Sequence, residues 1–429
     1  MADVIAIPDC EWLPEQVVGL IPGVAETNQF PRRFAEAGCR VLVPALVDRG
    51  NRFSGNPGVR QAKQSQREIL WRAGYELGRA LLGYELQRII AAANWLESTR
   101  SGNPVFGVES PALIAGRSQG SRSGRIGIIG YGEGGLLALL AGAVDERFDP
   151  VGVCGAFGLL SRLPEHPIDH NIWRFLQKFG DAELCAMILP RTVCVEFGCY
   201  PEVVLTDQNG GAPGALWRPS RAEFDLEIER VLRWAPDASV HAFYSSEHVI
   251  CSAEMSRAFM KSLCPTVNLG GKLGPAPAWA SGAGRADPWS RVLRQYREVL
   301  EDTQHLMRES EYARKQFWSR ADFSSVDSFV RSAEQYRDIF RSNVVGILPG
   351  RRVDPNPRSR QMFETETCHG YEVMLDVTDD VFAYGILVVP RGIRPGERRP
   401  AIVCQHGLEG RPSDVSVPTI DHRAYHSFG

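Results

Sequence analysis

The sequence has no long apolar run, no paired-cysteine motif and no strong excess of charge of either sign. Without an apolar run long enough to span a bilayer, no membrane-spanning helix is expected. The ten cysteines are scattered and none forms a CxxC pair, so reduced core thiols are expected rather than a zinc site or a disulfide framework. The formal net charge of −3 gives no reason to expect nucleic acid or an anionic membrane as a partner.

A secretory signal is also missing. The N-terminal segment Met1–Ile7 lacks a basic region, a long apolar core and a small-residue cleavage site. The cytoplasm is therefore the expected location, and export stays open if a further segment precedes this one.

The composition that is present is typical of a soluble globular protein, with 44% hydrophobic and 23% charged residues. The first part of the chain alternates strand-like and helix-like segments, a pattern that predicts an α/β fold with a mostly parallel sheet covered by helices on both faces. The expected strands are Val4–Ile7, Arg40–Leu46, Arg125–Gly130, Val151–Phe157, Thr192–Phe197 and Ser239–Tyr244. The expected helices are Asn28–Ala37, Gln66–Ser98, Leu136–Val144, Asn171–Lys178, Phe224–Trp234 and Ala253–Leu263.

Three regions are predicted: a first domain over residues 1–264, a linker and helical connector over 265–342, and the start of a second domain over 343–429. The last region begins irregularly. Two strand-like runs, Tyr371–Val377 and Phe382–Val389, are then expected to form a hairpin around Thr378-Asp379-Asp380, and Ala401–Cys404 is expected to be a third strand. Three strands cannot bury a stable α/β core, so this region is interpreted as a second domain cut off before its core forms.

The most informative stretch is Gly130-Tyr131-Gly132-Glu133-Gly134, where a buried strand meets a Gly-rich turn that opens a helix. This is the setting of a nucleophile elbow, G-x-S-x-G, in which the central residue adopts a strained backbone and the flanking residues must be small. Here the central residue is Gly132, which tolerates the strain but has no nucleophilic atom. The sequence therefore predicts the turn without the attacking group.

Other interpretations of this region are weaker. Gly130–Gly135 also fits the dinucleotide pattern G-x-G-x-x-G, but Glu133 would place a negative charge beside the phosphate, and the strand is not the first of the chain. Glu133 is not expected to act as nucleophile or base, since a side chain adjacent to the central position would point elsewhere. Gly116-Arg117-Ser118-Gln119-Gly120 matches G-x-S-x-G literally, but no helix follows, so a solvated loop is expected.

The chain order Ser, acid, His places the other candidate residues. His248 follows the expected strand Ser239–Tyr244, and Glu202 or Asp207 follows the strand before it, so these three are the vestigial triad candidates. With no serine to serve, a surface position for His248 is the competing interpretation. No histidine spacing indicates a metal site, and no cofactor is expected.

A second motif lies in the last region. His406-Gly407-Leu408 follows Ala401–Cys404 and resembles the His-Gly turn of an oxyanion loop, in which a backbone N–H binds the developing oxyanion. A tight strand-to-loop turn is the structural alternative. The corresponding position after Val4–Ile7 reads Pro8-Asp9-Cys10, which lacks the motif.

Taken with Arg67–Trp71, Gly83–Gln87 and Arg399–Gly410, the Gly-Tyr-Gly-Glu-Gly-Gly turn resembles the α/β-hydrolase superfamily, in particular two-domain bacterial proteins of the dienelactone-hydrolase and acetyl-xylan-esterase-like branch. The resemblance implies a family of carboxylic-ester hydrolases, with acyl esters of small molecules or carbohydrates as substrates. It also implies that the serine, acid and histidine belong to the second domain. This chain is then catalytically incomplete, and the alternative is a non-catalytic binding or scaffold domain; the oligomeric state stays open.

Overall fold

The computed structural model describes residues 2–54, 64–100, 125–206, 211–235, 239–267, 269–270, 273–279, 287–347, 353–417, 419–420 and 423–424. The chain divides into two compact units, Met1–Phe317 and Trp318–Gly429. None of the helices in these described ranges is long and apolar enough to cross a membrane.

The first unit is built on a six-stranded, fully parallel sheet in the order β2-β1-β3-β4-β5-β8. The strands are β1 (Asp3–Ile7), β2 (Arg40–Leu42), β3 (Ile126–Tyr131), β4 (Phe148–Cys154), β5 (Val193–Phe197) and β8 (Val240–Tyr244). Every residue of β1 and β3 is buried, as expected for strands covered on both faces. The predicted parallel sheet is therefore confirmed. A small antiparallel pair, β6 (Val203–Leu205) and β7 (Gly214–Leu216), lies outside it.

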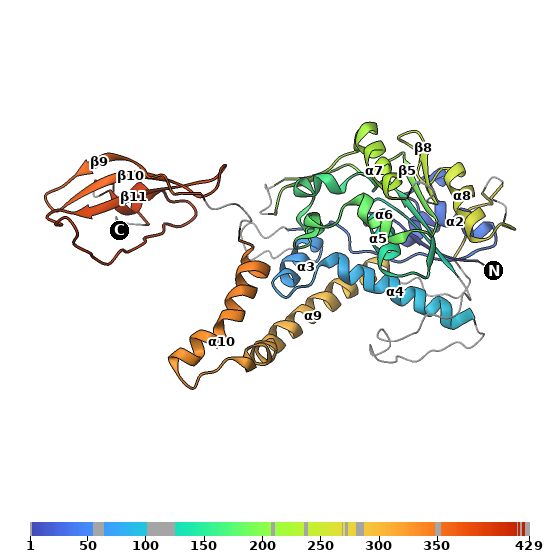
Figure 1. Cartoon of the computed structure of the whole chain (residues 1–429). Coiled ribbons are helices and arrows are strands. Elements are labelled where there is room, and N and C mark those ends of the chain that lie inside the picture. The colour runs from blue at the N-terminus through green and yellow to red at the C-terminus, as the bar shows by residue number, and fades with distance from the viewer. Residues whose placement is uncertain are drawn as a thin grey trace. The chain divides into compact units, whose positions relative to one another are not determined.

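Helices cover both faces of this sheet (Figure 1). One face carries α4 (Leu81–Arg100), α5 (Glu133–Val144), α6 (Asp181–Ile188) and α7 (Arg221–Trp234). The other face carries α2 (Phe30–Glu36) and α8 (Ala253–Leu263). Alternate strand residues supply the two cores, since neighbouring side chains of a strand point to opposite faces: Ile5 packs into the first core and Val4 into the second. The short helix α1 (Pro14–Val17) follows β1.

Several expected helices differ in extent. The stretch Gln66–Ser98 forms two helices, α3 (Gln66–Tyr75) and α4, because Gly78 turns the chain with a φ of +70°. The expected helix Asn171–Lys178 is wrong. Only a 3₁₀ turn forms at Phe175–Gln177, after Arg174 with a φ of +59°, and the helix of this region is α6 instead.

The long helix α9 (Pro288–Phe317) belongs to the first unit rather than to a separate connector. Its buried residues Tyr296 and Val299 pack with Leu70 and Leu81, and Arg291 is paired with Glu15 at 2.8 Å. The compact first unit thus extends beyond the expected boundary at residue 264, because the apolar stripe of α9 needs the surface of α3 and α4 to cover it.

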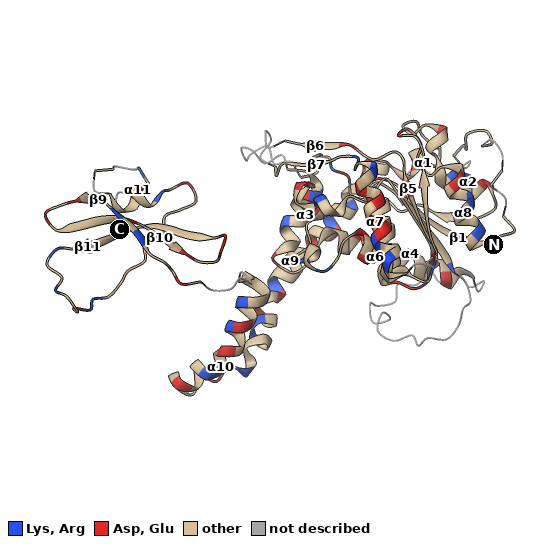
Figure 2. Ribbon diagram, turned by 45° about the horizontal axis from the view of Figure 1, so that its top comes forward, with Lys and Arg blue, Asp and Glu red and all other residues tan. Residues whose placement is uncertain are grey.

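The second unit contains α10 (Val326–Ile339), a three-stranded antiparallel sheet in the order β11-β10-β9, and the short helix α11 (Pro412–Ser416). Strands β10 (Cys368–Asp376) and β11 (Phe382–Pro390) form the expected hairpin. The third strand is β9 (Arg358–Glu364), not Ala401–Cys404, which has no strand structure here. Cross-strand ion pairs such as Arg358 with Asp376, at 2.5 Å, accompany the pairing of this polar segment. Figure 2 shows acidic and basic residues interspersed along α7 and α10.

Candidate functional site

The order of the strands places the reversal point of the sheet between β1 and β3. Strand β2 lies on one side of β1, and β4 lies on the far side of β3, so the connections that follow β1 and β3 lead to opposite faces of the sheet. In open α/β sheets, ligands bind at the carboxyl ends of the strands at this point of reversal. The residues that follow the two strands are Pro8-Asp9-Cys10 and Gly132-Glu133.

The turn after β3 has the backbone of an elbow. Gly132 adopts φ 58° and ψ −122° and is the N-cap of α5, which begins at Glu133 rather than at the expected Leu136. The flanking glycines are needed because a Cβ on Gly130 would lie 2.0 Å from the carbonyl oxygen of Gly134, and one on Gly134 would lie 2.2 Å from that of Ile7. These contacts leave no room for side chains on either side of the turn.

The space beside Gly132 is taken by Asp9. A Cβ added at Gly132 would lie 2.2 Å from Asp9 Oδ2 and 3.2 Å from Pro201 Cγ. Asp9 Oδ2 accepts the backbone N–H of Glu133 at 2.9 Å. In a nucleophile elbow, the N–H of the residue after the nucleophile is one donor of the oxyanion hole. The carboxylate of Asp9 therefore holds the donor that an oxyanion would use.

Glu133 is fully buried and forms the centre of a network of ion pairs. Its Oε1 accepts from Arg67 Nη2 at 2.6 Å, and its Oε2 accepts from Arg49 Nη2 at 2.7 Å. His170 Nε2 also lies 2.7 Å from Oε2. Burial by itself would raise the pKa of Glu133, but Arg67, His170 and Arg49 outweigh it and hold the pKa well below its usual value. Glu133 is therefore an ionised structural carboxylate.

Arg67 connects this network to three further elements. Its side chain is completely buried, and Nη1 donates to Glu85 Oε1 and to the carbonyl oxygen of Val47, both at 2.9 Å. Its Nε donates to Asp169 Oδ2 at 2.6 Å. A buried guanidinium is tolerated because its planar set of donors is matched by carboxylates and a carbonyl.

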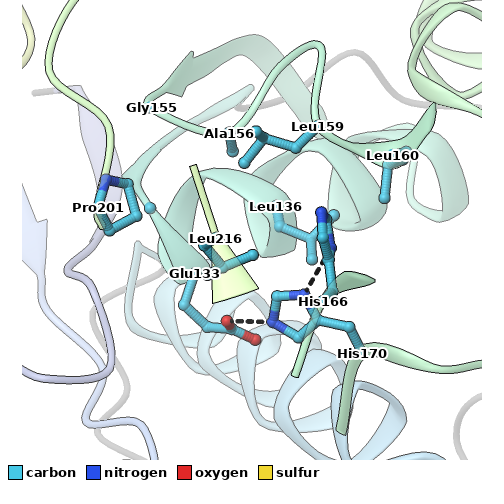
Figure 3. Close-up of a pocket in the computed structure, with 11 residues that line it drawn as sticks. Glu133, Leu136, Gly155, Ala156, Leu159, Leu160, His166, His170, Pro201 and Leu216 are labelled. Carbon is cyan, nitrogen blue, oxygen red and sulfur yellow. Dashed lines mark hydrogen bonds and ion pairs between the residues drawn. The ribbon is translucent and has the colours of Figure 1, made fainter. Parts of the chain in front are cut away.

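Two histidines continue the network toward a cavity. His170 Nδ1 lies 3.2 Å from His166 Nδ1, and Figure 3 shows the chain of contacts from Glu133 through His170 to His166. Burial, and then the neighbouring His170, lower the pKa of His166 to about 4, so His166 is neutral at physiological pH.

A small cavity lies at this end of the sheet, and its empty space of about 300 Å³ includes open solvent. Glu133, His166 and His170 form its polar side, and the rest of the wall consists of leucines, an alanine, glycines and a proline (Figure 3). Within the described residues, this wall contains no hydroxyl, thiol or amine that could act as a nucleophile.

Glu133, Asp169 and His170 place ligand-type atoms within 4.8 Å of one another, which is a spacing that a metal ion could use. The guanidinium of Arg67 already binds both carboxylates at 2.6 Å. A metal ion would be placed beside this fixed positive charge, so the arrangement fits an ion-pair network and does not fit a metal site.

The vestigial triad candidates lie elsewhere. His248 has a side chain that is 87% exposed and lies 3.9 Å from Glu247, and Glu202 is exposed just before β6. Among the described residues, neither lines the cavity beside Gly132. Asp207 and Ser118 lie outside the described residues.

The residues that do converge, Arg67, Asp169 and His170, were missed by sequence reasoning. Glu133 was expected to point away, but the first turn of α5 directs it into the network instead. The signals available were charged residues inside apolar helical stretches, such as Arg67 and Glu85, and the histidines four residues apart at positions 166 and 170.

The expected oxyanion loop lies in the second unit. His406 Nδ1 lies 2.7 Å from the carbonyl oxygen of Gly407, and both Gln405 and His406 contribute only local contacts to the described part of the chain. Leu408 is fully exposed. The G-x-G-x-x-G alternative meets a further obstacle, because Asp9 already places a carboxylate at the helix N-terminus where a phosphate would bind.

No family model matches the chain, and no curated protein does. Among solved structures, a protein described as a putative acetyl xylan esterase from Bacteroides fragilis NCTC 9343 matches with a TM-score of 0.37 and 16% identity, over 57% of this chain and 58% of that one. A carbohydrate esterase family 15 glucuronoyl esterase from Caldicellulosiruptor kristjansonii matches with a TM-score of 0.35 and 12% identity, over 67% and 73%. The chain thus spans little more than half the length of the first of these proteins. At such identities and TM-scores these likenesses carry no argument about this chain, and the site rests on its own residues.

Proposed function

We propose that this chain is part of a carboxylic-ester hydrolase family protein, and that its first unit is a non-catalytic domain with a hydrolase-type elbow. The observation that carries the proposal is the turn at Gly132. The backbone has the strained geometry of a nucleophile position, but the residue has no side chain, and the Asp9 carboxylate lies in the space where one would be. Such a unit serves as a scaffold, or as a substrate-binding partner for another domain.

A second inference concerns the region after β11. Ile402 and Val403 are 85% and 92% exposed, although the run Ala401–Cys404 has the composition of a buried strand. We infer that this segment and the following His406-Gly407-Leu408 belong to the opening part of another hydrolase-type domain, which would supply catalysis. The substrates of the complete protein would be carboxylic esters, including acyl esters of carbohydrates.

The direct test is hydrolysis of a short-chain aryl acetate, and of acetylated xylan oligosaccharides, by the purified 429-residue chain. We expect no turnover above the uncatalysed rate and no labelling by a fluorophosphonate, which reacts with activated serines. Ser118→Ala and His248→Ala serve as matched variants. Turnover that Ser118→Ala abolishes would make the loop serine the nucleophile and would overturn the proposal.

A further inference from the structure

The N-terminus of α5 lies next to the Asp9 carboxylate at the reversal point of the sheet. The helix has 12 residues, and its first N–H, that of Glu133, is donated to Asp9 Oδ2 at 2.9 Å. The N-terminus of a helix carries partial positive charge and free N–H groups, which together favour an anion. Asp9 supplies that anion from the segment after β1, more than a hundred residues earlier in the sequence.

A guanidinium contributes to the same place. Arg49 Nη1 lies 3.9 Å from Asp9 Oδ1, and the Arg49 side chain is only 4% exposed. Its Nη1 donates to Cys10 Sγ and its Nη2 to Glu133 Oε2, both at 2.7 Å, while its Nε has no hydrogen-bond partner among the described residues. A buried donor without a partner costs free energy, so the Arg49 guanidinium keeps one donor that an acceptor could satisfy. The backbone N–H of Glu11 also binds Asp9 Oδ1, at 3.0 Å.

We propose that Asp9 is an internal ligand of a small-carboxylate site, and that it keeps the N-terminus of α5 closed to external anions. The site consists of the Glu133 N–H, the Glu11 N–H and the Arg49 guanidinium. The side chain of Asp9 has the size and charge of acetate, and its carboxylate alone has the size of formate. This proposal rests on the contacts of Asp9 and is independent of ester hydrolysis by any part of the protein.

The test is chemical replacement of the removed carboxylate. Asp9→Ala removes a formate-sized group and Asp9→Gly an acetate-sized one, so formate should bind the first variant and acetate should bind the second better than the first. We expect ~100 mM of the matching anion to raise the midpoint of thermal unfolding by roughly 2 °C or more relative to the same concentration of chloride. The amide resonance of Glu133 should shift in the same titration.

Asp9→Asn is the matched control, because it fills the space and retains a hydrogen-bond acceptor while removing the charge. Neither it nor the wild-type chain should respond to formate beyond the chloride reference. If Asp9→Ala does not fold in chloride, its refolding in formate becomes the readout, and formate-dependent recovery supports the proposal. An Asp9→Ala chain that responds no more than Asp9→Asn, or that formate fails to recover, overturns it.

Discussion

Gly132 is the residue at which the backbone and its surroundings both exclude a side chain. Its φ of 58° disfavours any residue with a Cβ, and the nearest atom to that Cβ would be Asp9 Oδ2 at 2.2 Å. Gly132→Ala should therefore lower the free energy of unfolding by roughly 2–4 kcal/mol, from backbone strain and the forced displacement of Asp9. Urea denaturation followed by circular dichroism measures the loss.

Gly83→Ala is the control for this substitution. Gly83 lies in α4, and a Cβ there would meet nothing within 4 Å, so alanine should leave the stability unchanged or raise it by up to about 1 kcal/mol. Equal effects of the two substitutions would contradict the steric interpretation of the elbow.

His166 and Asp181 are buried groups with shifted pKa values, and their contributions to the pH dependence of stability have opposite signs. Burial and the adjacent His170 lower the pKa of His166 to about 4, whereas burial raises the pKa of Asp181 to about 7. Between pH 6.5 and 4 the unfolded chain binds a proton at His166 that the folded chain does not, so this contribution falls as the pH falls. Asp181 behaves oppositely, because the folded chain retains its proton between pH 3.8 and 7.

Substitution of the two residues should therefore change the pH dependence of the unfolding free energy in opposite directions. On going from pH 7.5 to pH 5, His166→Asn should gain about 2 kcal/mol of unfolding free energy relative to the wild type, since it removes the histidine penalty. Asp181→Asn should lose a similar amount relative to the wild type over the same range. Urea unfolding at the two pH values gives both numbers, and shifts of the same sign in the two variants would refute the assignment.

At the scale of elements, Arg67 holds together parts of the fold that the sheet does not connect. It is carried by α3 and binds Glu85 of α4, Glu133 of α5, and Asp169 of the 3₁₀ turn Ile168–His170. Arg67→Met keeps much of the side-chain volume but removes the cation that binds Glu85 and Asp169, and leaves Glu133 with Arg49 and His170 only. We expect a loss of about 3–5 kcal/mol in chemical denaturation.

Arg72→Met is the matched control on the same helix. Arg72 pairs with Glu68 one turn away, but its side chain is 49% exposed, so the substitution should change stability by no more than about 0.5 kcal/mol. A loss of comparable size for Arg72→Met would mean that charge on α3, and not the buried network, determines its stability.

At the scale of the whole molecule, the two units differ in how many residues of their described strands are buried. All six residues of β3 are buried, whereas Gly370 is the one buried residue in the three described strands of the second unit. Backbone hydrogen bonds without apolar cover open at low free energy. Amide hydrogen exchange should therefore be at least ~100-fold faster in β10 than in β3, as measured by mass spectrometry of the full chain. Equal protection would show that the second unit is stabilised by interactions beyond its own described core.

The alternation of apolar strands and amphipathic helices is enough to predict the parallel sheet, because a strand that reads as a continuous apolar run must be covered on both faces. The elbow was also predictable, because local backbone sterics require glycine at positions 130, 132 and 134. Errors arose where local pattern was insufficient. Ala401–Cys404 has strand composition but no pairing partner among the described residues, while the polar segment of β9 pairs through cross-strand charges.

The set of charged side chains that meet at this end of the sheet was decided only by the tertiary structure. Asp9, Arg49, Arg67, Glu133 and His170 come from segments spread over the first 170 residues, and the order of the strands brings them together. Sequence spacing predicts contacts within one helix or between neighbouring turns. It does not predict which buried charges will meet at the carboxyl ends of the strands. The absence of a nucleophile at the turn follows from Gly132 alone. The position of the Asp9 carboxylate beside Gly132 depends on β1 lying next to β3.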